Sequence, residues 1–199
     1  LLDQYADAIA ESPDALRNLG IITSHGFYVG GYDNRWYGSH TPKGIETLRS
    51  LRPGLHAWVT STSWSRMDSR FLKEIWGNIY EAGVNGLIPW AGLQRPPLWI
   101  GGDPNPGCAI RVSEDGKYEI MPGYYFYKQV SRAGQPGMKV ARTMSMDSEL
   151  PVIAFASDGT GKSDSFVVVN TSLKSEKMIE ITIKGTDSKI FRLFRTSGN

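Results

Sequence analysis

The stretch that decides the fold is LHAWVTSTSW, residues 55–64. Its apolar first half is compatible with a buried strand, and four hydroxyl side chains follow at its carboxyl end, at residues 60–63. One helix later, residues 84–90 (VNGLIPW) have the same design and also end on a tryptophan. Two parallel strands that deliver an indole to the same edge predict a site for a flat, hydroxyl-rich ligand, and a sugar is the leading candidate.

The composition is that of an ordinary globular chain. It has 199 residues, enough for one large or two small domains, with 40% hydrophobic and 21% charged residues. Aromatic residues make up 11%, a modest excess that often marks carbohydrate or peptide contact surfaces, although a well-filled core accounts for many of them. The net charge is +2 and no long basic run occurs, so nucleic acid is not expected as a partner.

Several classes of site are not expected. The single cysteine, Cys108, excludes an intrachain disulfide framework. Three scattered histidines and one cysteine lack metal-ligand spacing, and no phosphate-binding glycine loop occurs, so we predict no metal and no cofactor. No apolar run reaches the roughly 18 residues of a membrane span, and no signal peptide is recognised. The chain starts on Leu1 inside an apparent helix, which leaves open a natural N-terminus upstream.

The chain up to Trp90 alternates between helical and strand patterns. Helices are predicted over 3–19, over 42–51 and over 68–82, and strands over 21–28, 55–64 and 84–90. Ser12-Pro13 interrupts the first helical stretch and predicts a cap and a proline at the first turn of a second short helix. This order with short connections favours parallel strands joined by crossover helices. Within it we expect Trp58 to lie in the core.

A different pattern follows Trp90. Residues 91–107 form a long irregular loop, of a length that is usually functional. Asp115-Gly116 then predicts a hairpin, and residues 121–130 a short helix. After residues 134–137 the sequence changes to short alternating runs that predict an antiparallel sandwich: 139–143, 152–157, 165–170, 178–183 and 190–195.

These pieces resemble the C-terminal half of a clan A glycoside hydrolase, family 30-like or galactocerebrosidase-like. The resemblance is a pattern that covers most of the chain. It rests on residues 20–28 with His25 after a strand, 58–60, 86–90, 107–109, 121–130, 135–138 and 166–172.

The resemblance implies an α/β plus all-β fold: the last strands and helices of a (β/α)8 barrel, followed by an antiparallel β-sandwich. Residues 1–134 would supply barrel strands six, seven and eight, and residues 135–199 would form the side sandwich, not necessarily complete. The site would lie at the carboxyl ends of the strands. Retaining members use two carboxylates about 5 Å apart, one as acid/base and one as nucleophile.

The sequence departs from this family pattern at both carboxylates. The acid/base glutamate belongs to a strand that would precede Leu1, and Ser61 stands at the nucleophile position. A serine without an adjacent base is a poor nucleophile toward an acetal carbon. Three explanations stay open: an engineered replacement, a natural non-catalytic relative, or an alignment that is off by a few residues.

The candidate site residues come from the resemblance at position 61 and, for the others, from their places at strand ends and in loops. Ser61 is the catalytic position, and the candidate substrate-binding residues are His25, Tyr28, Trp36, Trp64, Trp90, Gln94 and Arg95. Each has an ordinary structural alternative: barrel filling for Trp90, a buried and satisfied imidazole for His25, and a loop anchor for Trp64.

The resemblance therefore implies a retaining glycoside hydrolase of β-linked glycans, or the C-terminal portion of one. The alternative is a non-catalytic carbohydrate-binding protein derived from such a hydrolase, and a structural adhesion domain is a weaker third possibility. Whether the chain is an enzyme stays open, because it carries neither family carboxylate. The expected partners are carbohydrate and either the missing N-terminal barrel part or a second copy, since three barrel strands leave sheet edges open. We expect a secreted or periplasmic location.

Overall fold

The computed structural model describes residues 2–28, 41–63, 68–96, 107–186 and 190–197. The chain divides into two compact units, Leu1–Tyr124 and Tyr125–Asn199, which are treated one at a time below. The boundary expected after residue 134 stays a prediction.

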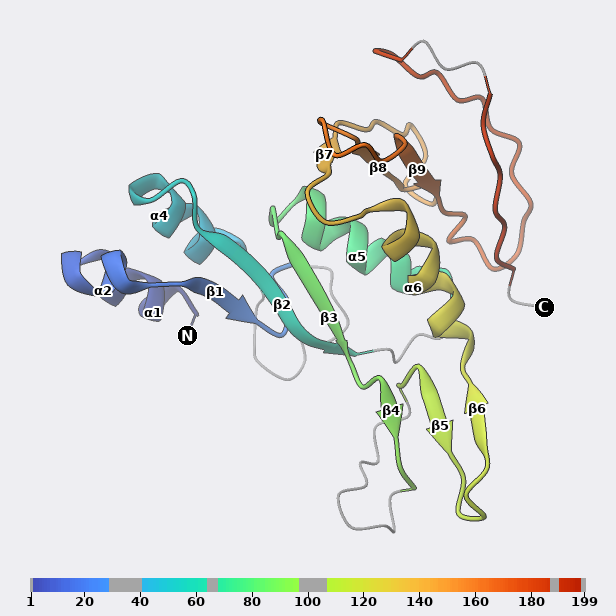
Figure 1. Cartoon of the computed structure of the whole chain (residues 1–199), viewed down its shortest axis with the longest axis horizontal. Helices are drawn as coiled ribbons and strands as arrows, with labels where there is room; N and C mark the ends of the chain where they lie inside the picture. Colours follow the sequence, from blue (N-terminus) through green and yellow to red (C-terminus); the bar gives the residue numbers. More distant parts are fainter. Residues whose placement is uncertain (1, 29–40, 64–67, 97–106, 187–189, 198–199) are drawn as a thin grey trace. The chain divides into compact units, whose positions relative to one another are not determined.

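A three-stranded parallel sheet organises the first unit (Figure 1). Its strands are β1 (Ile21–Ser24), β2 (His56–Ser63) and β3 (Gly86–Trp90), in the order β1-β2-β3. The register pairs Ile22 with Ala57, and Val59 with Leu87. The parallel arrangement predicted from the alternation of helices and strands is therefore confirmed, although β1 ends four residues earlier than expected.

Four described helices accompany this sheet. They are α1 (Leu2–Ala10), α2 (Pro13–Asn18), α4 (Lys43–Leu51) and α5 (Arg70–Tyr80). The Oγ of Ser12 accepts a hydrogen bond from the Ala15 backbone N–H at 3.3 Å, and Pro13 fills the first turn, so α2 begins where the sequence predicts. α5 ends just before Gly83, whose φ of 64° is the left-handed conformation typical of a helix stop.

The hydrophobic core lies between one face of the sheet and these helices. Its members are Phe27, Ile45, Ala57, Val59, Ala82 and Val84. Ala57 and Val59 alternate along β2 and are fully buried, which is the period-2 pattern of a strand with one covered face. A second cluster of Ala6, Leu48 and Leu55 packs α1 against α4.

Arg49 ties α4 to the segments that precede β2 and β3. Its guanidinium donates to the carbonyl oxygens of Leu55 and Gly83, both at 2.8 Å, and to Asn85 Oδ1 at 2.6 Å. The same Asn85 oxygen accepts the backbone N–H of Ala57 at 3.0 Å. Polar groups at the amino ends of β2 and β3 are thereby satisfied by the Arg49 and Asn85 side chains.

A second small sheet follows β3 in the first unit. It contains β4 (Leu93–Gln94), β5 (Ile110–Val112) and β6 (Tyr118–Ile120), with β4 parallel to β5 and β5 antiparallel to β6. The hairpin predicted around Asp115-Gly116 is confirmed. The next helix, α6 (Pro122–Ala133), begins where the sequence predicts and ends three residues later than expected.

The second unit holds an antiparallel sheet of β7 (Lys139–Ala141), β8 (Val152–Ala156) and β9 (Ser165–Val168). These match three of the five predicted runs. The other two runs, 178–183 and 190–195, are described and carry no strand. Alternation specifies which side chains share a face, whereas a ladder also needs a neighbouring strand, which alternation does not specify.

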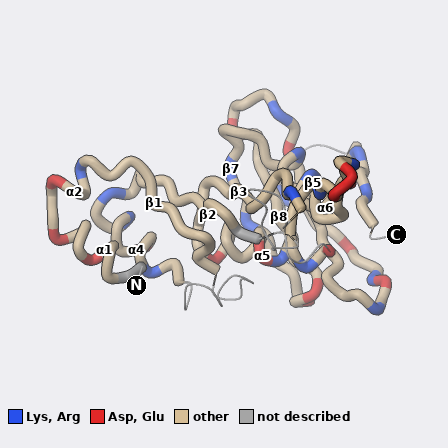
Figure 2. The backbone as a smooth tube through the Cα atoms, turned by 90° about the horizontal axis from the view of Figure 1, so that it is seen from below, with Lys and Arg blue, Asp and Glu red and all other residues tan. Residues whose placement is uncertain are grey.

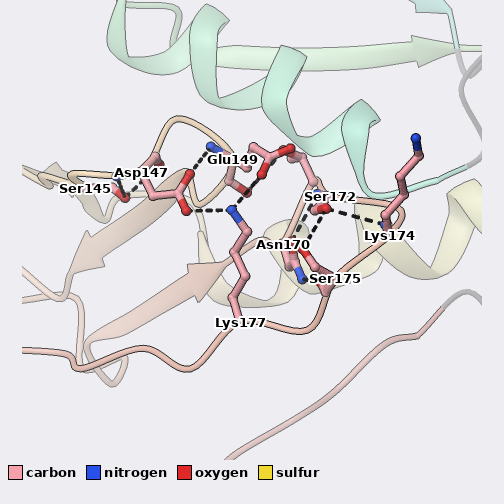
Figure 3. Close-up of polar contacts among 9 residues, drawn as sticks. Ser145, Asp147, Glu149, Asn170, Ser172, Lys174, Ser175 and Lys177 are labelled. Atoms are coloured by element: carbon pink, nitrogen blue, oxygen red, sulfur yellow. Dashed lines mark hydrogen bonds and ion pairs between the residues drawn. The ribbon is translucent and has the colours of Figure 1, made fainter.

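A polar clamp fixes the segment after β9 (Figure 3). The ammonium of Lys177 donates to Asp147 Oδ2 at 2.5 Å and to Glu149 Oε2 at 2.6 Å. The hydrogen bond from Lys177 lowers the pKa of Asp147, with a further contribution from the backbone N–H of Glu149. The clamp joins residues 28 to 30 positions apart in the sequence.

We predict that Lys177→Met destabilises the second unit in a pH-dependent way. The pKa of Asp147 is lower in the folded chain than in the unfolded chain. The ion pair therefore stabilises the fold at pH values above the unfolded-state pKa of Asp147, and this stabilisation is lost as the pH falls through its folded-state pKa. The wild-type advantage in urea unfolding should thus be largest near neutral pH and vanish in strong acid. Lys174→Met is the control, since the Lys174 side chain points away from the clamp in Figure 3. An advantage that does not change with pH would contradict the clamp.

Candidate functional site

The carboxyl ends of β1, β2 and β3 meet at one edge of the parallel sheet. There, Ser63 of β2 is in register with Trp90 of β3, and Thr62 with Pro89. The hydroxyl of Thr60 approaches the Ser24 carbonyl oxygen of β1 at 3.5 Å. Parallel strands bring their carboxyl ends together in this way, and ligands of α/β folds bind at that edge.

Ser61 has a distinctive backbone at this edge. Its φ is 96°, and the β2–β3 register shifts between Thr60 and Thr62, so Ser61 is an extra residue in the ladder. Non-glycine residues rarely adopt positive φ, and bulges of this kind re-aim a side chain. The strained, bulged residue is the same one that the alignment places at the nucleophile position.

Aromatic side chains lie on the sheet face opposite the core. Trp90 ends β3 with 49% of its surface exposed, and Ile88 is 51% exposed on the same face. Trp58 is 38% exposed, so its predicted place in the core is wrong. A Cβ at Gly86 would lie 3.0 Å from the Trp58 ring, which means that the indole lies directly over this glycine. The peptide bond from Trp90 to Ala91 is cis.

His25 and Tyr28 follow β1 but separate from each other. His25 comes directly after the strand and is half-buried. Phe27 turns into the core, where its backbone N–H donates to Asn78 Oδ1 at 3.0 Å. The Tyr28 ring then lies over Gly77 of α5, where a Cβ would come within 2.4 Å of it. Burial, followed by Glu81 and Glu74, raises the pKa of the Tyr28 phenol.

The other candidates lie beyond β3 or outside the described residues. Gln94 is buried in β4, and Arg95 is exposed directly after it. Trp36 and Trp64 fall outside the residues that the structure describes. The structure therefore brings His25, Ser61 and Trp90 to one sheet edge and places Tyr28 on α5.

The strand ends contain no carboxylate. Residues 24–28, 60–63 and 90–95 include neither Asp nor Glu.

In the described part of the chain, no group of three or more His, Cys, Asp or Glu side chains is placed to hold a metal ion. None of the helices that the structure describes is long and apolar enough to cross a membrane. Figure 2 shows basic and acidic residues interspersed along the backbone.

Sequence reasoning missed Asn78, which supports the turn after β1. It is fully buried on α5, and its amide also donates to the Glu74 carbonyl oxygen at 3.0 Å. The available signal was a polar residue within the apolar stripe of an amphipathic helix, beside Ile75 and Ile79. Buried amides of this kind are almost always hydrogen-bonded.

Two solved structures are similar to this chain. SrfJ from Salmonella typhimurium has 18% sequence identity and a TM-score of 0.64 over 85% of this chain and 38% of its own. The catalytic domain of GH30 xylanase C from Talaromyces cellulolyticus has 20% identity and a TM-score of 0.50, over 75% of this chain and 32% of its own. No protein-family profile and no curated protein matches the sequence.

The chain thus has a fold like that of family 30 glycoside hydrolases over a partial region, and it is a mixed α/β structure with small sheets. It spans about two fifths and one third of the lengths of the two similar structures.

Proposed function

We propose that this chain is the C-terminal part of a retaining glycoside hydrolase framework for β-linked glycans, with Ser61 at the nucleophile position. The observation that carries the proposal is the bulge at Ser61, two residues before Ser63, which is the register partner of the half-exposed Trp90 at the carboxyl edge of the parallel strands. The likeness to the catalytic domain of a GH30 xylanase supports it at the level of the fold.

The chemistry of the strand ends favours binding over hydrolysis. A retaining mechanism needs two carboxylates about 5 Å apart, and the described strand ends supply hydroxyl, imidazole and indole groups. A hydroxyl without a base does not displace an alkoxide from an acetal carbon at a useful rate. The indole of Trp90 and the His25 ring can still stack on a sugar and hydrogen-bond to it, because binding needs no nucleophile.

The alternative is a carbohydrate-binding protein that derives from such a hydrolase and has no chemistry of its own. The specific observation in its favour is the run of four hydroxyl residues, 60–63, where the family has its nucleophile. The two proposals predict different results when a carboxylate is restored at position 61. In a hydrolase framework the restored carboxylate reacts with a glycoside, whereas in a non-catalytic binding protein it does not react.

The test uses dinitrophenyl β-glycosides with the Ser61→Glu variant. In that variant a carboxylate oxygen bonds to the anomeric carbon while the bond to dinitrophenolate breaks, and this leaving group departs with the electron pair and needs no acid. We expect intact-mass analysis to detect one glycosyl group per chain in this variant and none in the wild type.

Thr62→Glu is the matched control, because it places the same carboxylate one residue away from the bulge. An adduct on this control and not on Ser61→Glu would show that position 62, and not position 61, is the nucleophile position. No adduct on either variant, together with saturable binding of the same glycosides by calorimetry, would favour the non-catalytic alternative.

We further propose that β1, β2 and β3 are the last three strands of a barrel and that the second unit is its side sandwich. Parallel sheets are normally covered on both faces, whereas Trp58, Ile88 and Trp90 are exposed on one face here. The remaining barrel part, or a second copy of the chain, would cover that face.

The purified chain should therefore associate. We expect multi-angle light scattering to give a mass above the 22.0 kDa of one chain. A monodisperse species of 22.0 kDa at all concentrations would contradict the need for a partner.

A further inference from the structure

His25 lies in a short turn that is held on both sides. On the side of the sheet, Ser24 ends β1 in register with Val59 of β2, and its carbonyl oxygen accepts the Thr60 hydroxyl at 3.5 Å. The Ser24 hydroxyl in turn donates to the Gly26 carbonyl oxygen at 3.2 Å, so one hydrogen bond spans His25. Gly26 is buried, and His25 is half-buried at the carboxyl edge of the sheet.

Helix α5 holds the other side of the turn through two adjacent residues. Phe27 is 2% exposed, and its backbone N–H donates to Asn78 Oδ1 at 3.0 Å. The Tyr28 ring packs so closely on Gly77 that a Cβ there would lie 2.4 Å from the ring. The chain is therefore fixed by α5 two residues after His25, and the turn has little freedom to move the imidazole away from the edge.

Asn78 is itself held in one orientation. Its amide N–H donates to the Glu74 carbonyl oxygen, four residues earlier on α5, at 3.0 Å, and the residue is fully buried. Because the nitrogen is engaged by the helix, the oxygen is the atom that meets the Phe27 N–H. A helix also positions a side chain more precisely than a loop does. The turn is thus anchored to a rigid acceptor on a regular element.

We propose that Asn78 is a positioning residue for glycan binding, which acts by holding His25 at the carboxyl edge of the sheet. The inference rests on the proposed carbohydrate site and adds to it a residue of the helix layer that touches no sugar. A hydrogen bond from a side chain to a sugar hydroxyl weakens steeply outside about 2.7–3.2 Å and a nearly linear angle. A displaced turn therefore loses the contribution of His25 while the rest of the site stays in place.

The chain contains a matched contact at the opposite edge of the same sheet. Asn85 Oδ1 accepts the Ala57 backbone N–H, also at 3.0 Å, near the start of β2. Asn85→Leu therefore removes the same kind of acceptor as Asn78→Leu. Both substitutions leave a backbone N–H without its acceptor and lower the free energy of unfolding, but the Asn78 contact alone lies in the turn that carries His25.

The first test is a double-mutant cycle between Asn78 and His25 in the full chain. Titration calorimetry measures the affinity for a panel of β-linked oligosaccharides of glucose, galactose and xylose. We expect Asn78→Leu to weaken the tightest of these complexes by about threefold or more, and to cause no further loss in a His25→Ala chain, because the two residues act as one unit. Asn85→Leu should leave the affinity unchanged.

The outcomes separate positioning from stability and from the proposed function. An affinity that Asn78→Leu does not change, or lowers equally with and without His25, would overturn the positioning role. An equal loss in Asn85→Leu would also overturn it, by assigning the effect to stability. No binding of any oligosaccharide by the wild type would overturn the proposed function and this inference with it, which is a different result from binding with additive losses.

Gly77→Ala is a second variant that perturbs the same turn and leaves Asn78 in place. The added Cβ displaces the Tyr28 ring, while alanine favours the helix more than glycine does, so α5 stays formed. Its loss of affinity should likewise vanish in a His25→Ala chain. A loss that remains there would overturn the role of the turn.

Proton NMR at one fixed pH gives a readout that needs no ligand. The Cε1–H signal of His25 is identified by its absence in His25→Ala. We expect this signal to move in Asn78→Leu and to stay in place in Asn85→Leu, because the first substitution alone releases the turn. A His25 signal that does not move in Asn78→Leu would overturn the proposal.

Discussion

Trp90→Ala is expected to weaken glycan binding by about tenfold or more, which corresponds to a loss of roughly 1.4 kcal/mol. Trp90 presents half of its surface at the end of β3, in register with Ser63, which follows the bulge at Ser61 by two residues. An indole face contributes a large apolar area to a sugar ring, and alanine contributes almost none of it. Isothermal titration of a panel of β-linked oligosaccharides measures the change.

Two further variants separate stacking from general effects. Trp90→Phe keeps a smaller ring and should retain part of the affinity. Tyr5→Ala removes an exposed aromatic residue from α1, 66% exposed, and should leave the affinity unchanged. Equal affinities for wild type and Trp90→Ala would remove Trp90 from the site, and absence of binding by the wild type would remove the carbohydrate proposal.

The second large effect is on stability. Asn78→Leu should lower the free energy of unfolding by about 1–3 kcal/mol, because the backbone N–H of Phe27 would stay buried without its acceptor. Leucine has the same number of side-chain heavy atoms and the same branching as asparagine, so no cavity is left and the effect reports the lost hydrogen bonds. Urea unfolding followed by tryptophan fluorescence measures it.

The chain offers a closely matched control in Asn18→Leu. Asn18 donates its amide to the carbonyl oxygen of Asp14, four residues earlier, as Asn78 does to Glu74. Asn18 is exposed, and no hydrogen bond like the one from the Phe27 N–H to Asn78 is described for its side-chain oxygen. Its substitution should therefore change the free energy of unfolding by less than about 0.5 kcal/mol. Similar losses in both variants would show that the Phe27 contact is unimportant.

The parts of the fold that were predicted correctly depend on local patterns. β2 was recognised because Ala57 and Val59 alternate with polar or larger residues before a run of hydroxyls. The start of α2 and the hairpin at Asp115-Gly116 follow from capping and turn residues, which act within a few positions.

The missed parts depend on contacts between distant residues. β1 ends at Ser24 because the Phe27 backbone N–H donates a hydrogen bond to Asn78, 51 positions away, and not to a neighbouring strand. The same turn places the Tyr28 ring against Gly77 of α5. The exposure of Trp58 depends on which face of the sheet the helices cover, and alternation along one strand does not specify that face. For the candidate site, the family resemblance indicated Ser61 and the place at a strand end indicated Trp90, whereas the bulge at Ser61 became visible only in the backbone.

The parallel register of the first sheet has a consequence for the order of folding. The β5–β6 hairpin closes a short loop, but register partners such as Ile21 and His56 are separated by a whole helix and its connections. Pairings that close long loops form late, since their entropy cost precedes any gain in contacts. The sheet edge that carries Ser61 and Trp90 is therefore among the last features to assemble, and a nascent chain acquires its candidate site only when most of the first unit is complete.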